Sequence, residues 1–120
     1  LYGAYDLCVR QGTIDQVAQE MEHYLSLQQK YYDEGNVPET VKYALQFDKC
    51  IVTGTKNSYL ISMYEHIEDI FYLMALHSNQ RGEDDRHNNF TEHKMILKSI
   101  QEHDAAALHK WLGIHYDKHL

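Results

Sequence analysis

The sequence predicts an all-α protein, an antiparallel bundle of about six helices that folds as one domain over residues 1–120. Apolar residues recur every three or four positions over long stretches, which is the spacing of amphipathic helices. Alternating β-branched residues, which would indicate strands, are scarce, and the chain has a single proline and six glycines. The breaks between apolar stretches are short, so consecutive helices should run antiparallel.

Three helices are expected in the first half of the chain, over residues 1–11, 13–33 and 37–54. Thr13 and Gln16 have the spacing of a capping box, which predicts the start of the second helix after the glycine break. Asn36 is suited to cap the third helix, because Pro38 and Glu39 follow it in the first turn.

Three more helices are expected in the second half. The fourth begins at Asn57 or Ser58 and, as the most apolar helix, is expected at the centre of the bundle. The polar stretch SNQRGEDD ends it. A fifth helix runs through Phe90 to about His103, and Asp104 is placed to cap the sixth.

Composition excludes several classes of protein. Eighteen Asp and Glu residues against eleven Lys and Arg give a net charge of −7, so this segment should repel nucleic-acid phosphates. The chain shows no apolar run long enough for a membrane span and no signal peptide, so a cytoplasmic protein is expected. Cys8 and Cys50 are expected to be reduced structural thiols.

Three residues able to bind metal occupy positions where the helical period calls for apolar residues. Asp48, His93 and His115 each lie one turn from apolar neighbours, on three different predicted helices, so all three should face the core. One carboxylate and two imidazoles form the ligand set of an open transition-metal site. The alternative is a buried polar network in which these groups satisfy one another without an ion.

Four other residues are weaker candidates for a site. His66 is a candidate fourth metal ligand, and the competing interpretation is a partly exposed polar residue. Tyr43, Tyr59 and Tyr64 are candidates for an effector pocket, since each could direct its hydroxyl into a polar cavity. Packing in the core is the competing interpretation for these tyrosines.

The C-terminal stretch EHKMILKSIQEHDAAALHKWLGIHYDKHL resembles the end of the FCD domain, the effector domain of FadR-subfamily GntR transcription regulators. A glutamate–histidine pair, an isoleucine–leucine pair, an aspartate, an alanine-rich helix and a second histidine follow in the family's order. The gap of 22 residues between His93 and His115 is also that of the family. Upstream, FDKCIVTGTKNSYL resembles the family's Phe-His helix, with Phe47 and Asn57 matching.

The resemblance includes two departures at the metal site. The family has an aspartate three residues before the matching phenylalanine and a histidine directly after it, where this chain has Ala44 and Asp48. His93 and His115 match the family's two remaining ligands. The resemblance therefore implies a divalent metal, zinc or nickel above all, held by Asp48, His93 and His115.

By resemblance, the chain is the ligand-sensing and dimerisation domain of a regulator, and it binds a small carboxylate effector. DNA would be bound only through an N-terminal winged helix-turn-helix, which this chain does not contain. Two other classes stay open. The second class is a helical-bundle metalloenzyme that uses the same centre for hydrolysis or oxygen chemistry. A di-iron bundle needs two Glu-x-x-His motifs, and the sequence has only Glu20 with His23, which argues against an enzyme. The third class is a helical interaction module that binds no ligand.

Overall fold

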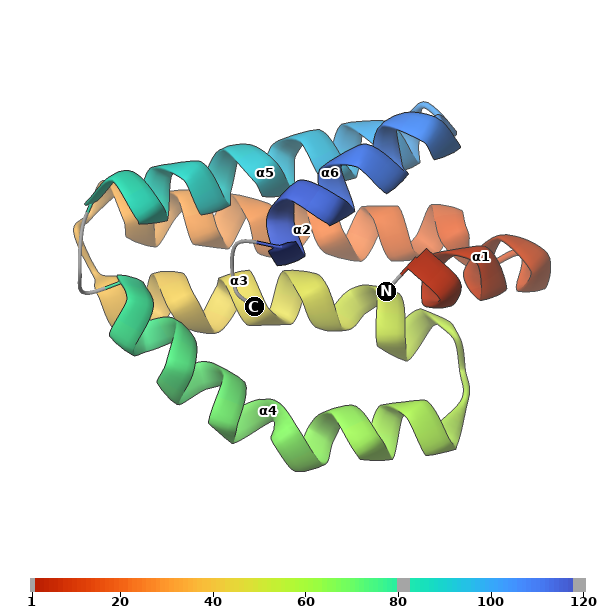
Figure 1. The fold of residues 1–120 in the computed structure, drawn as a ribbon, viewed down its shortest axis with the longest axis horizontal. Helices are drawn as coiled ribbons and strands as arrows, with labels where there is room; N and C mark the ends of the chain where they lie inside the picture. Colours follow the sequence, from red (N-terminus) through yellow and green to blue (C-terminus); the bar gives the residue numbers. More distant parts are fainter. Residues whose placement is uncertain (1, 80–82, 118–120) are drawn as a thin grey trace.

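A computed structural model describes the backbone of residues 2–79 and 83–117 and the side chains of residues 3–77 and 88–115. Within these residues the chain forms six helices and no strand, which confirms the all-α bundle (Figure 1). The helices are α1 (Tyr2–Gln11), α2 (Ile14–Asp33), α3 (Val37–Gly54), α4 (Ser58–Asn79), α5 (Glu83–Gln101) and α6 (Ala105–Asp117).

The antiparallel pair α2 and α3 forms the centre of the bundle (Figure 1). Helix α5 lies beside α2, α6 packs on α5, and the short α1 lies against α2 and α3. Helix α4 packs mainly on α3. Its C-terminal end lies close to the start of α3, and the rest of the helix bends away from α3 along the lower edge of the view (Figure 1). The core is therefore built by five helices, and α4 covers one side of α3.

Polar side chains cap three of the helices where the sequence predicts it. The Asn36 side chain accepts a hydrogen bond from the Glu39 backbone N–H at 3.2 Å, and Asp104 accepts one from the Ala107 N–H at 3.0 Å. At the start of α4, Asn57 Oδ1 accepts from two backbone N–H groups, at 3.0 and 3.2 Å. Each bond satisfies a donor that the first helical turn leaves without a partner.

The predicted capping box at the start of α2 is wrong. Thr13 precedes the helix, but its side chain makes no capping bond. Its hydroxyl donates instead to the backbone oxygen of Gly54 at 2.8 Å, with a longer contact of 3.3 Å to that of Cys8. Carbonyls at helix C-termini lack intrahelical partners, and the fold brings the ends of α1 and α3 within reach of Thr13. The residue therefore joins three helices.

The predicted central position of α4 is also wrong. Tyr59 is 75% exposed, Ile70 56% and Leu73 64%, although α4 is rich in apolar residues. The core is filled by side chains of the other five helices, and α4 needs only its Leu60 and Tyr64 side to cover α3. Apolar composition alone did not distinguish a central helix from one with a second, exposed apolar face.

Both cysteines are buried free thiols, as predicted. Among the described residues, none of the helices combines the length and the apolarity that a membrane span needs. The largest fully buried apolar side chains, Phe47, Met21 and Ile51, belong to the α2–α3 pair, with Ile96 of α5 packed against them. The candidate site adjoins this cluster.

Gly54 lies where α3 approaches α1 and α2. A Cβ atom there would overlap the Val17 side chain and lie 3.1 Å from Cys8 Sγ. We expect Gly54→Ala to lower the free energy of unfolding by about 1–3 kcal/mol because the extra methyl overpacks the core. Gly113→Ala is the matched control, since no atom lies within 4 Å of its Cβ position, and it should stabilise α6 by about 0.5–1 kcal/mol. Urea denaturation measures both, and equal effects would contradict the packing.

Candidate metal centre

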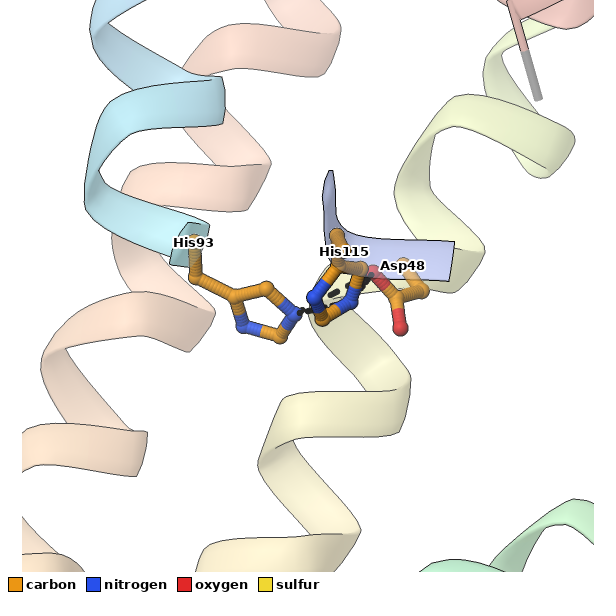
Figure 2. Close-up of side chains that lie close together, drawn as sticks. All are labelled: Asp48, His93 and His115. Carbon is orange, nitrogen blue, oxygen red and sulfur yellow. Dashed lines mark hydrogen bonds and ion pairs between the residues drawn. The ribbon is translucent and has the colours of Figure 1, made fainter. Parts of the chain in front are cut away.

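Three side chains from three helices converge at one point in the core (Figure 2). Asp48 comes from α3, His93 from α5 and His115 from α6. One donor atom from each residue lies within 4.8 Å of the other two. His93 Nε2 is 3.3 Å from Asp48 Oδ1 and 3.2 Å from His115 Nε2, and His115 Nε2 is 3.7 Å from Asp48 Oδ1. The inward positions inferred from the sequence thus meet in space.

Ordinary helical packing brings these groups together. The Phe47 ring stacks on the His93 ring with centroids 4.1 Å apart, which fixes the plane of that imidazole. On α6, His115 lies three residues after the buried Leu112, so the face that anchors α6 in the core also carries the imidazole inward. Both histidine side chains are buried and Asp48 is 15% exposed, so the site is reached from the Asp48 side.

The outer nitrogen of each imidazole already has a partner. His93 Nδ1 lies 2.9 Å from Gln28 Oε1, and His115 Nδ1 lies 2.9 Å from Glu92 Oε1. Both partner atoms are oxygens, which accept hydrogen bonds, so each Nδ1 carries the proton and donates it. Both Nε2 atoms therefore face Asp48, where they can serve as metal ligands.

The charges within the cluster are strongly coupled. Burial raises the pKa of Asp48, but the neighbouring His93 and His115 outweigh it and hold that pKa below its usual range. Burial has the opposite effect on the imidazole of His115, whose pKa it lowers, but hydrogen bonds and charge from Asp48 and Glu92 outweigh burial and raise this pKa to about 9. For His93 burial dominates, and its pKa is lowered. Without a metal, His115 is the protonated member at neutral pH.

The donor set fits a divalent transition metal. Two imidazole nitrogens and one carboxylate oxygen converge in a buried pocket, and the second nitrogen of each ring is held by an acceptor, as is usual for metal-binding histidines. A cation bound among these atoms would take the place of the His115 Nε2 proton.

The remaining predicted site residues lie elsewhere, with one exception. His66 is exposed on α4 and is not a member of the cluster. Tyr43 stacks on Tyr31 with centroids 5.5 Å apart, and Tyr59 is on the surface. Tyr64 is half-buried, and burial together with the charge of Asp48 raises its pKa.

Tyr64 also lines an apolar pocket of about 420 Å³ between α1, α3 and α4. Val52 of α3 belongs to the same pocket and follows Asp48 by one helical turn. The other lining residues are Gly3, Ala4, Leu60, Met63 and Ile67. The pocket is therefore close to Asp48, the carboxylate of the cluster.

The sequence interpretation missed the two residues that hold the imidazoles. Gln28 lies seven residues after Met21 on the inward stripe of α2, so its position already indicated a buried polar group. Glu92 was part of the matching motif but had no role assigned. It could not be paired with His115 before the α5–α6 packing was known.

The described helices form an all-α bundle with a buried carboxylate and two inward imidazoles at its core. The family model described as FCD domain matches residues 3–118, and the chain belongs to that family. FCD domains are the C-terminal effector-binding domains of GntR-family regulators, a regulatory family and not a family of enzymes. No curated protein and no solved structure matches the chain.

The raised pKa of His115 predicts how stability depends on pH in chelator-treated protein. A folded pKa of about 9, above the ordinary 6.5, gives stability that is complete below pH 6.5 and lost as pH rises through 9. The loss should reach at most about 3 kcal/mol. Urea denaturation at pH 6.5, 8 and 9.5 measures it. His115→Gln, which does not titrate, should flatten this dependence, and an unchanged slope would contradict the assignment.

Proposed function

We propose that this domain senses a small organic acid for a FadR-subfamily GntR regulator in the cytoplasm. The acid binds through a divalent metal, zinc or nickel, held by Asp48, His93 and His115, and its binding alters DNA binding by a separate winged helix-turn-helix. The observation that supports the proposal is the convergence of the three donor atoms, with both Nδ1 atoms turned outward to acceptors.

The charge of the site favours an anion as ligand. Asp48 is the one carboxylate among the three donors, so its ligands leave one positive charge of a divalent ion uncompensated at the open coordination positions, and Glu92, the next carboxylate, lies behind His115. When bound, such a metal supplies that charge and open coordination positions for a carboxylate. The pocket beside Tyr64 offers apolar surface for the remainder of a small acid.

A sensor that addresses two DNA half-sites is expected to be a homodimer. Helix α4 supports a dimer through its exposed apolar side. Met63, Ile67, Ile70 and Met74 follow one another at intervals of four, three and four residues, the repeat by which two helices pack against each other. A second copy of α4 would cover this face.

One observation favours a second candidate function, a helical module that binds no ligand. The carboxylates of Asp48 and Glu92, both imidazoles and the Gln28 amide satisfy one another in the structure without an ion. A polar network of this kind could serve to fix the packing of α3, α5 and α6. Metal binding separates the two functions.

Metal should stabilise the fold. Zinc or nickel added to chelator-treated protein should raise the Tm. At a hundredfold excess of metal over Kd, the free energy of unfolding should increase by about 2.7 kcal/mol. His93→Ala and His115→Ala should each remove most of this gain because each deletes a ligand. His109→Ala is the control, since His109 is exposed on α6. Differential scanning fluorimetry measures the shifts, with circular dichroism to verify that each variant folds.

The same assay tests the effector. A small dicarboxylate or hydroxy acid should stabilise further, and only in the presence of metal. Two results would contradict the metal site and favour the polar network. The Tm would not change on addition of zinc or nickel, and chelator-treated protein would bind the acid as tightly as metal-loaded protein.

The dimer can be tested through α4. Ile70→Glu places a charge at the middle of the exposed apolar side and should convert a dimer into a monomer in light scattering at tens of micromolar. Ser62→Glu adds the same charge at an exposed position of α4, on the side of the helix that also carries His66 and Asp69. This variant should leave the dimer intact. A wild-type protein that is monomeric at this concentration would contradict the proposed dimer.

A further inference from the structure

Two buried side chains that are not ligands contact the imidazoles of the triad from outside. Gln28 of α2 is 1% exposed and Glu92 of α5 is 4% exposed. Each places one oxygen 2.9 Å from an Nδ1 atom, Gln28 at His93 and Glu92 at His115. The site therefore has a second layer, to which α2 contributes although it supplies no ligand.

We propose that Gln28 and Glu92 are positioning residues of the metal centre, which hold both imidazoles with Nε2 toward Asp48. This inference rests on the proposed function. A neutral imidazole carries its proton on one nitrogen only, and an acceptor at Nδ1 selects the form whose Nε2 lone pair is free. Without both acceptors, each ring could carry its proton on the nitrogen that the metal needs.

Asn89 completes the arrangement on the Gln28 side. An amide can present either its oxygen or its NH₂ group to an imidazole, and these two orientations select opposite tautomers. Gln28 Nε2 donates to Asn89 Oδ1 at 3.0 Å, which leaves Gln28 Oε1 for His93. Asn89 precedes His93 by one turn of α5, so a single glutamine bridges both side chains.

The two positioning residues differ in charge, which makes the two ligands unequal. Glu92 is a buried carboxylate, and it strengthens His115 as an electron donor more than a neutral amide strengthens His93. Removal of Glu92 should therefore weaken metal binding more than removal of Gln28.

The experiment measures the zinc affinity of the 120-residue chain by competition with a chromogenic chelator. Gln28→Leu and Glu92→Leu remove the acceptors at similar volume, and each should weaken zinc binding roughly 10- to 100-fold, Glu92→Leu the more. Gln29→Leu and Glu102→Leu are the matched controls, because Gln29 is the exposed neighbour of Gln28 and Glu102 is an exposed glutamate just beyond the end of α5, and both variants should bind zinc as the wild type does.

Imidazole ¹⁵N NMR of the zinc-free protein provides the readout that a purely structural role would not change. His93 should carry its proton on Nδ1 in the wild type and shift toward Nε2 in Gln28→Leu. Asn89→Leu should cause the same shift by releasing the Gln28 amide, whereas Asn89→Asp keeps the acceptor and should preserve the tautomer. Glu92→Gln keeps an acceptor oxygen for His115 and should retain part of the affinity lost in Glu92→Leu.

The outcomes distinguish this inference from the proposed function. If the wild type binds zinc and the leucine variants bind it equally well with the His93 tautomer unchanged, the positioning role is wrong and the metal site stands. If the wild type binds no zinc, the proposed function fails, and the tautomer of His93 in the zinc-free protein still decides whether Gln28 orients its ring. Should a leucine variant not fold, the Asn89 pair and Glu92→Gln give the answer.

Discussion

Two imidazoles are buried beside a carboxylate, and the packing of four helices has to satisfy all three groups. An isolated buried charge would cost several kcal/mol, so each of these groups needs a partner with good geometry. Asp48, His93 and His115 satisfy this requirement only where α3, α5 and α6 meet, and Gln28 adds α2. The polar cluster therefore fixes the relative placement of four helices that apolar packing alone would allow to slide.

Under the proposed function, the same cluster would hold either a proton or a divalent cation. With a proton on His115, its members satisfy one another, and with a divalent cation among the three inner atoms the outer hydrogen bonds to Gln28 and Glu92 can stay in place. A change of charge at the centre then acts on α3, α5 and α6 together. Such a centre suits a domain whose family is regulatory.

Helix α4 stands apart from this arrangement. Lys49 of α3 holds it through Glu68 at 2.9 Å and Glu65 at 3.9 Å, while its opposite side remains apolar and exposed. Tyr64 of α4 lines the pocket and is close enough to Asp48 for the charge of that carboxylate to raise its pKa. Helix α4 therefore lies between the solvent and the Asp48 side of the cluster.

The helices, three of their caps and the residues that face inward could all be predicted from the sequence. These are local properties, because Asn36, Asn57 and Asp104 act within one turn and the inward position of Asp48 follows from the helical period alone. Contacts between distant segments could not be predicted in this way, because they depend on how the helices pack. Thr13 bonded to Gly54 instead of capping α2, and α4 lay outside the core.

The candidate site also has one part that the sequence predicts and one part that depends on the packing of the helices. Spacing placed Asp48, His93 and His115 on inward faces, yet the orientation of each ring depends on a side chain 65 or 23 residues away, Gln28 for His93 and Glu92 for His115. Periodicity along one helix states that a residue faces the core, but it carries no information on which atoms of another helix it meets. That information exists only once the helices have packed, and it decides which nitrogen of each imidazole is available to a ligand.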